Sequence, residues 1–273
     1  MNCLSAKEWI KSQIGVWEVF YEKRDVRDKD VHPAVMPIAL AKRTIELFTH
    51  RGELVLDPFN GIGTTLLAAK DLDRNGVGFD ISEKYCKYGR ERLSQTKLSG
   101  TAQQFVISDD ARNIPNYLEK DSVQLIFTSP PYANLLNRKR LNKSRRGDLR
   151  DNKQYLRVEQ YSQDERDLGT LEIENYAQEL KEIYSGLLSL VRPKGHSVVN
   201  VPDMWWSDGK FGRRIPIHTY VYHAMLDAGF ELRNTIIWDR TNIVNRVGIF
   251  GWPSNYITMG TTFEYLLDFW KPP

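Results

Sequence analysis

Cysteine, histidine and long hydrophobic runs are all scarce in this chain of 273 residues. The two cysteines, Cys3 and Cys86, provide neither a disulfide framework nor a CxxC metal motif, and the five histidines lack the spacing of a zinc site. We therefore expect free thiols and no metal. No stretch approaches 18 consecutive apolar residues, and residues 1–10 have neither a basic leader nor an apolar core. We expect no membrane span, no secretory signal and a cytoplasmic location.

The composition is that of an ordinary globular protein. Apolar residues make up 41% of the chain and charged residues 27%, which excludes a disordered or collagen-like chain. A length of 273 residues fits one large α/β domain or two small ones. Residues 1–25 contain Trp9, Ile14, Val16 and Trp17, and we interpret them as a short amphipathic arm that packs against the rest of the protein.

Segments with the apolar patterns of strands and helices alternate along the chain. The patterns predict strands at 53–56, 76–79, 105–107, 123–127, 197–201, 232–238 and 263–270, and helices at 38–48, 66–72, 82–93, 176–191 and 217–228. Such alternation favours a mainly parallel sheet with helices on both faces. Ligands bind such sheets beyond the carboxyl ends of the strands. Asp57, Asp80, Ser129 and one of Asp109 or Asp110 fall at those ends.

Positive charge is concentrated in one stretch. Residues 138–157 contain nine Lys or Arg and two Asp, whereas the whole chain carries a net charge of only +3. A concentrated basic stretch is typical of contact with a polyanion such as DNA, and the alternative is a solvated loop. The cations that we single out for phosphate contact are Arg138, Lys139, Arg140, Lys143, Arg145 and Arg146.

A glycine-containing turn follows the first predicted strand, at residues 57–65 (DPFNGIGTT). It is not a dinucleotide fingerprint, because the third glycine of GxGxxG would fall at Leu66, and it lacks the GK[ST] ending of a phosphate loop. Its glycines let the backbone approach a ligand closely, and the Asp57 carboxylate suits an amino-acid ammonium group. Asp80, at the end of the next strand, is placed to accept two ribose hydroxyls, or else only caps the following helix.

Two motifs make the chain resemble the amino-methyltransferases of DNA. The segment DPFNGIGTT is similar to their S-adenosylmethionine motif, and residues 128–132 (TSPPY) resemble their catalytic motif in its serine form. Residues 32–37 (HPAVMP), with the helix after them, resemble the segment that closes over the methionine end of the cofactor. Residues 191–195 and 236–240 match later elements in the same order, so the resemblance covers roughly residues 26–270.

This resemblance implies a Rossmann-like methyltransferase fold with a seven-stranded, mostly parallel sheet, an antiparallel last strand and helices on both faces. It implies a single catalytic domain over residues 1–273 and S-adenosyl-L-methionine as the cofactor. The residues it assigns to the cofactor are His32, Pro37, Asp57, Phe59, Asn60, Gly61, Gly63, Thr64, Thr65, Asp80, Ile81 and Asp110. Asp110 is preferred to Asp109 because two residues beyond the strand end reach the cleft, and Phe59 has the alternative of a core position.

The catalytic motif comprises Ser129, Pro130, Pro131 and Tyr132. The lone pair of an exocyclic base amine is delocalised into the ring, and the Ser129 hydroxyl and the Pro130 carbonyl can each accept one amine hydrogen to localise it. Two consecutive prolines keep this strand end rigid. Tyr132 would stack on a base flipped out of the duplex. The alternative is an ordinary Pro-Pro strand terminator with a surface tyrosine.

Serine in this motif favours the N4 amine of cytosine in duplex DNA, and N6 of adenine is the alternative. We expect a site-specific enzyme of a restriction-modification system, with DNA and a cognate restriction endonuclease as partners. Two other classes remain open. The first is a cofactor-binding or DNA-binding module without turnover, and the second is an enzyme that methylates RNA or a protein glutamine.

Three segments are candidates for DNA contact. The first is the basic insertion at residues 133–172, and the second is residues 202–214, where Trp205 and Trp206 accompany Lys210, Arg213 and Arg214. Aromatic rings beside cations suit stacking on unpaired bases and contact with phosphate, although the tryptophans could equally belong to the core. The third is residues 240–255, where Arg246 and Asn255 could read base edges.

Overall fold

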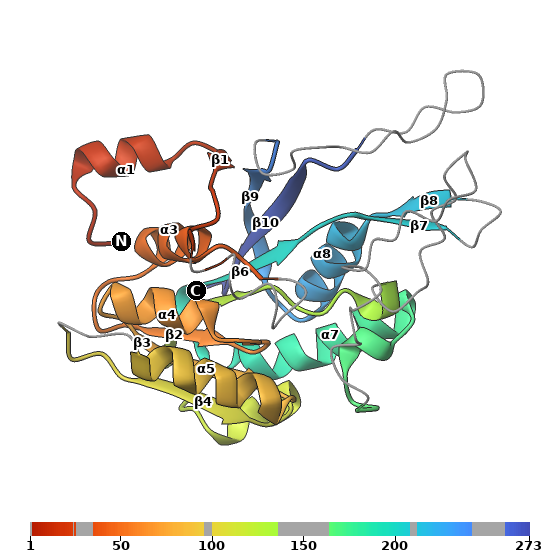
Figure 1. The fold of residues 1–273 in the computed structure, drawn as a ribbon, viewed down its shortest axis with the longest axis horizontal. Helices are drawn as coiled ribbons and strands as arrows, with labels where there is room; N and C mark the ends of the chain where they lie inside the picture. The colour runs from red at the N-terminus through yellow and green to blue at the C-terminus, as the bar shows by residue number, and fades with distance from the viewer. Residues whose placement is uncertain are drawn as a thin grey trace.

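A computed structural model describes residues 2–23, 25, 35–95, 100–135, 164–207, 212–241 and 260–273. Within these ranges the chain forms an eight-stranded sheet flanked by helices, together with a separate two-stranded hairpin (Figure 1). The mostly parallel sheet expected from the sequence is confirmed, and so is its antiparallel last strand.

The sheet has the strand order β1-β9-β10-β6-β5-β2-β3-β4. Its strands are β1 (Val16–Glu18), β2 (Leu54–Asp57), β3 (Asn75–Asp80), β4 (Gln104–Ser108), β5 (Val123–Thr128), β6 (Val191–Val201), β9 (Glu231–Asp239) and β10 (Phe263–Trp270). Strands β3 and β4 extend the sheet on one side of β2, and β5 and β6 extend it on the other. The junction of β2 and β5 is therefore a topological switch point, the place where open α/β sheets bind ligands.

Helices cover both faces of the sheet because its central strands are apolar on both sides. Helices α3 (Ile38–Phe48), α4 (Thr64–Asp71) and α5 (Glu83–Gln95) contribute to one buried cluster, which also contains Val55 of β2. Helices α7 (Ile173–Leu188) and α8 (Ile217–Asp227) and the 3-10 turn η1 (Ala111–Asn116) contribute to the other, which contains Leu56. Successive residues of one strand thus serve opposite faces.

The amino-terminal arm adds a strand that the sequence did not predict. After the short helix α1 (Ala6–Ser12), strand β1 pairs in parallel with β9, and the Ile237 amide donates to the Gly15 carbonyl at 2.8 Å. Trp17 is 1% exposed, but Trp9, Ile14 and Val16 are 42%, 60% and 56% exposed. The prediction of a packing arm is therefore correct for Trp17 and wrong for the other three residues. Backbone pairing to β9 and the burial of Trp17 and Val19 together fix this arm.

The glycine turn is packed directly on strand β3. The Asn60 amide donates to the Phe79 carbonyl at 2.7 Å, and the Asn60 side chain, 4% exposed, lies over Gly78. A Cβ atom at Gly78 would lie 2.4 Å from the Asn60 Oδ1 and 2.9 Å from its Cβ. Only glycine at position 78 lets the turn approach the strand this closely.

We predict that Gly78→Ala destabilises the protein by about 1–3 kcal/mol, because a buried side chain must move to admit the new methyl group. In thermal unfolding this loss lowers the midpoint by several degrees. Gly15→Ala is the matched control, since the nearest atom to its Cβ would be the Thr235 carbonyl oxygen at 3.9 Å. Equal midpoints for the two variants would contradict this account of the turn.

Candidate active site at the switch point

A cavity opens at the carboxyl ends of β2, β3 and β5. It is lined by Val35, Met36, Asp57, Pro58, Phe59, Asn60, Gly61, Ile62, Thr64, Thr65, Asp80, Ile81, Ser82, Tyr85, Asp110, Ala111, Arg112, Ser129, Pro130, Pro131, Tyr132, Arg166, Asp167, Leu168 and Ile183. The glycine turn and the TSPPY motif, 71 residues apart at Asp57 and Thr128, therefore meet in one crevice.

Asp57 joins the two motifs directly. Its Oδ1 accepts a hydrogen bond of 2.6 Å from the Thr128 hydroxyl and one of 3.1 Å from the Phe59 amide. The side chain is only 3% exposed, and burial raises the pKa of Asp57 to about 6. A buried carboxylate held by neutral donors favours a positively charged partner in the cavity.

Asp80 links the glycine turn to the next helix. Its Oδ2 accepts from the Gly61 amide at 2.7 Å, and its Oδ1 accepts from the Ser82 amide at 2.9 Å. Burial, together with the neighbouring charges of Asp57 and Asp167, raises the pKa of Asp80 to about 6. Asp80 therefore accepts a backbone hydrogen bond at the start of α5 and also lines the cavity. The two roles that the sequence offered for this residue, helix capping and ligand contact, are compatible.

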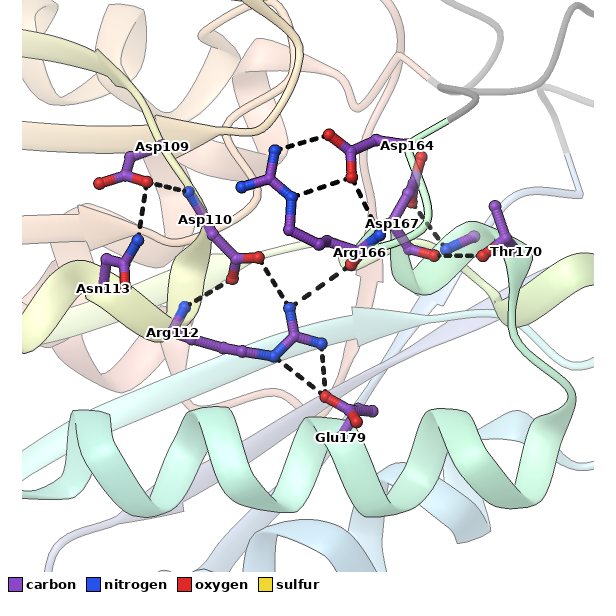
Figure 2. Close-up of polar contacts among 10 residues, drawn as sticks. Asp109, Asp110, Arg112, Asn113, Asp164, Arg166, Asp167, Thr170 and Glu179 are labelled. Atoms are coloured by element: carbon purple, nitrogen blue, oxygen red, sulfur yellow. Dashed lines mark hydrogen bonds and ion pairs between the residues drawn. The ribbon is translucent and has the colours of Figure 1, made fainter.

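The two consecutive aspartates after β4 have different surroundings (Figure 2). Asp109 accepts hydrogen bonds from the Asn113 amide and the Tyr117 hydroxyl, at 2.9 and 2.7 Å, and is not among the residues that line the cavity. Asp110 does line it, is 7% exposed and forms an ion pair of 2.8 Å with Arg112. Of the two, only Asp110 is available to a ligand in this cavity.

The catalytic motif forms the wall next to the glycine turn. Ser129 Oγ and the Tyr132 hydroxyl lie 2.7 Å apart, within hydrogen-bonding distance. Tyr132 is 8% exposed and belongs to the core beneath α7, so the alternative of a surface tyrosine is wrong. Burial raises the pKa of Tyr132 far above its usual range, which keeps its hydroxyl protonated.

Most of the residues that the sequence assigned to the site line this cavity, with a few exceptions. Pro37 is buried at the start of α3, and its neighbours Val35 and Met36 line the cavity in its place. Gly63 precedes α4 with φ of +80° and shapes the turn without lining the cavity. His32, Arg138, Lys139, Arg140, Lys143, Arg145 and Arg146 lie outside the described residues, as do Lys210, Arg246 and Asn255.

Arg213 and Arg214 lie on the hairpin formed by β7 (Met204–Ser207) and β8 (Gly212–Ile215). Neither is among the cavity residues, and in Figure 1 the hairpin extends away from the helices α3, α4 and α5. Arg214 pairs in register with Trp205, and Arg213 pairs with Trp206. Trp205 and Arg214, which were expected to act together, are thus cross-strand neighbours in one hairpin.

Sequence reasoning missed part of the cavity wall. Arg112, Arg166, Asp167 and Leu168 line it, although none is part of a recognised motif. Asp167 is 5% exposed, and its Oδ1 accepts a hydrogen bond of 2.7 Å from the Gly169 amide at the start of the 3-10 turn η3 (Leu168–Thr170). An aspartate two residues before a glycine is a weak capping signal. It does not indicate that the aspartate lines a cavity whose other residues are distant in sequence.

The donor set in the cavity fits S-adenosyl-L-methionine. Asp57, Asp80, Asp110 and Asp167 supply carboxylates, which suit an ammonium group, a ribose and a base amine. Ile62, Ile81 and Leu168 add apolar surface for a purine ring. Asn60 Oδ1 is buried without a hydrogen-bond partner in the described part of the chain. A polar ligand in this cavity suits such an atom, since buried polar groups are normally paired.

Among the described residues no group of three or more His, Cys, Asp or Glu is arranged to hold a metal ion. No described helix is both long and apolar enough to cross a membrane. Cys3 is exposed and Cys86 is buried, and both are free thiols.

Comparison with known families confirms the resemblance seen in the sequence. The N6/N4 methyltransferase family model, described as DNA methylase, matches residues 5–91. The chain is 51% identical over 70 residues to the type II methyltransferase M.HindIII of Haemophilus influenzae, covering 26% of this chain and 23% of that protein. It is 31% identical over 120 residues to M.BglI of Bacillus subtilis, covering 44% and 33%. The chain thus spans about a quarter to a third of the length of such relatives.

Solved structures match over more of the chain. TrmN from Thermus thermophilus superposes with a TM-score of 0.52 at 18% identity, covering 86% of this chain and 49% of that one. A methyltransferase from Pyrococcus furiosus gives 0.50 at 14% identity, covering 92% and 97%. The expected Rossmann-like methyltransferase fold is confirmed.

We predict that Asp57→Asn stabilises the ligand-free protein by up to about 3 kcal/mol above pH 6. The folded-state pKa of about 6 exceeds the ordinary 3.8, so the ionised carboxylate costs stability at neutral pH, and this cost declines as the pH falls toward 4. Asparagine retains an Oδ1 for Thr128 and Phe59. Thermal unfolding at pH 8 and pH 4 measures the difference.

The control for this prediction is Asp227→Asn, which removes the same charge from an exposed position at the end of α8. Its unfolding midpoint should change little at either pH. A lower midpoint for Asp57→Asn than for the unmodified protein at pH 8 would contradict the assignment of Asp57 as a costly buried charge.

Proposed function

We propose that this chain transfers a methyl group from S-adenosyl-L-methionine to an exocyclic amine of a base in duplex DNA, at N4 of cytosine. The observation that carries the proposal is the single cavity lined by both the glycine turn and Ser129 to Tyr132. A cofactor site and an amine-activating motif in one crevice are what this reaction requires. N6 of adenine is the second candidate, because cytosine and adenine present the same N–C=N amine edge.

The cofactor is held mainly by carboxylates. When bound, S-adenosyl-L-methionine supplies a methyl group activated by a positively charged sulfur. Asp57 binds the ammonium group, Asp80 accepts from the ribose hydroxyls, and Asp110 accepts from the adenine amine. Thr128 and the Phe59 amide orient Asp57, so it is positioned before the ligand arrives.

The target amine is activated by the end of β5. Ser129 Oγ and the Pro130 carbonyl each accept one amine hydrogen, and this localises the nitrogen lone pair. The Tyr132 hydroxyl stays protonated and lies 2.7 Å from Ser129 Oγ. By donating to Ser129 Oγ, Tyr132 occupies one of its two lone pairs and leaves the other to accept an amine hydrogen. This role adds to the stacking expected of the tyrosine ring, which is largely buried.

DNA is held by cations of the β7–β8 hairpin and of the basic stretch. Arg213 and Arg214 of the β7–β8 hairpin contact phosphates, and Trp205 beside Arg214 stacks on a base that has left the duplex. The basic stretch at residues 138–157 adds further phosphate contacts. A restriction endonuclease of the same sequence specificity is the proposed partner, since relatives such as M.HindIII are type II methyltransferases.

We predict that the protein, incubated with duplex DNA and cofactor labelled in its methyl group, places label in N4-methylcytosine. Hydrolysis of the DNA to nucleosides and chromatography identify the product. Label in N6-methyladenine would select the second candidate. Bound cofactor without label in DNA would favour a binding module without turnover, and the same assay with RNA tests whether the substrate class is wrong.

We predict opposite effects for two further variants. Ser129→Ala removes an amine acceptor and should lower kcat by about 100-fold or more, while cofactor affinity changes by less than about threefold. Asp80→Ala removes the acceptor for Gly61 and Ser82 and should weaken cofactor binding strongly at nearly unchanged kcat under saturation. Calorimetry with cofactor and steady-state kinetics separate the two effects. Equal changes in both quantities for both variants would contradict these roles.

A further inference from the structure

An arginine that belongs to no recognised motif holds the carboxylate of Asp110. Arg112 and Asp110 both line the cavity. The Arg112 backbone amide donates to Asp110 Oδ1 at 2.9 Å, and Arg112 Nη1 donates to Asp110 Oδ2 at 2.8 Å. Both oxygens of one carboxylate therefore accept from the same residue, once from its backbone and once from its side chain. Two such contacts fix the rotation of the carboxylate as well as its position.

The guanidinium of Arg112 is itself held from the opposite side. Glu179 of α7 accepts from Arg112 Nε at 3.0 Å and, through the same Oε2 oxygen, from Nη2. Arg112 Nη1 also lies 3.5 Å from the Arg166 carbonyl oxygen. Figure 2 shows the guanidinium between Asp110 and Glu179, with α7 beneath it. Contacts thus run without a break from the cavity wall at Asp110, through Arg112, to helix α7.

The burial of Asp110 strengthens its contact with Arg112. Asp110 is buried, whereas the side chains of Arg112 and Glu179 are 32% and 34% exposed. A charged hydrogen bond to a buried carboxylate is screened less by water and salt than one between two exposed groups. Arg112 can therefore hold Asp110 in one orientation before a ligand binds.

Attachment of the turn η1 to α7 is a simpler role for Arg112. Its contacts with Glu179 would be sufficient for that attachment, because they do not involve Asp110. The cap of η1 needs only the contact between the Arg112 amide and Asp110 Oδ1. The side-chain contact with Asp110 Oδ2 goes beyond both requirements. Since each carboxylate oxygen has two lone pairs, one lone pair on each oxygen remains for a ligand.

A carboxylate in a fixed orientation can select between purines. The 6-amino group of adenine donates hydrogen bonds, whereas a 6-oxo group in the same place is an acceptor and is repelled by a carboxylate. A carboxylate that is free to rotate could turn to the ring N1–H of a 6-oxopurine instead. Selectivity for the amine therefore depends on the residues that prevent this rotation.

We propose that Arg112, held by Glu179, is a positioning residue that fixes Asp110 and makes the nucleoside end of the cavity selective for a 6-aminopurine. This inference rests on the proposed function, in which Asp110 accepts from the adenine amine of the cofactor. It extends that function to two residues outside the family motifs. Arg112 acts on the purine through Asp110 and not by direct contact.

The first test compares binding of 5′-methylthioadenosine and 5′-methylthioinosine, which differ at position 6 of the purine, by calorimetry. The unmodified protein should prefer the adenosine by about tenfold or more, because the inosine replaces a hydrogen bond to a charged acceptor with a repulsion. Arg112→Gln should reduce this preference to less than about threefold, because Asp110 is then free to rotate.

Arg192→Gln is the matched control for Arg112→Gln. Arg192 forms an ion pair of 2.9 Å with Glu53, at the amino ends of β6 and β2 and so at the opposite end of the strands from the cavity. The variant removes the same side chain and breaks a comparable ion pair. Because the site is distant from Asp110, the preference should stay within about twofold of that of the unmodified protein.

Glu179 is tested by a conservative and a non-conservative variant. Glu179→Gln retains an oxygen that can accept from Arg112, and should keep the preference within about twofold. Glu179→Ala removes that acceptor, and should lower the preference by about threefold or more. Thermal unfolding of the two variants shows whether both are folded at the temperature of the calorimetry. Equal preferences for Glu179→Gln and Glu179→Ala would overturn the role of Glu179.

A double-mutant cycle distinguishes positioning from a purely structural role. In the Asp110→Ala background, Arg112→Gln should change the affinity for 5′-methylthioadenosine by less than about twofold, because the carboxylate on which Arg112 acts is absent. A structural role for Arg112 would lower this affinity by the same factor with Asp110 present or absent. That result would overturn the inference.

The outcomes separate this inference from the proposed function. If the unmodified protein binds neither S-adenosyl-L-methionine nor 5′-methylthioadenosine, the proposed function fails. If it binds both but does not prefer the adenosine to the inosine, only this inference fails. An unchanged preference in Arg112→Gln would overturn the inference as well, even if both nucleosides bind more weakly by a common factor.

Discussion

The hydrogen bond from the Thr128 hydroxyl to the Asp57 carboxylate connects the two halves of the site. It spans the switch point between β2 and β5, where strands that are distant in sequence become neighbours. Because both strands are buried and parallel, their carboxyl ends are fixed side by side by the backbone ladder. The strand pairing and the hydrogen bond between Thr128 and Asp57 are then sufficient to keep the glycine turn and the TSPPY motif within one crevice.

Much of this arrangement could be predicted from the sequence because the determinants are local. Helix α3 has the expected bounds, and the strands that end at Asp57, Asp80 and Thr128 lie within a residue or two of their predicted ends. A two-residue offset after β4 was sufficient to favour Asp110 over Asp109. Apolar runs and the residues that end them determine such features, and both can be read without tertiary information.

Features that depend on contacts between distant segments could not be predicted in this way. Strand β1 has three residues, too few for a periodic pattern, and exists because β9 offers an unpaired edge. The burial of Tyr132 depends on α7, and the cavity wall at Asp167 depends on Arg112 and Asn134. In each case the decisive partner lies elsewhere in the chain, so the local sequence carries only a weak signal.

The position of β1 also affects how the protein associates with itself. Without this strand, β9 would also present free amide and carbonyl groups at Ile237–Asp239, which lengthens the kind of edge on which foreign strands assemble into aggregates. With it, the outermost strand is only three residues long and ends at the charged residue Glu18. The short first strand thus serves as a cover that limits aggregation, and expression fragments that begin after residue 18 would lose that protection.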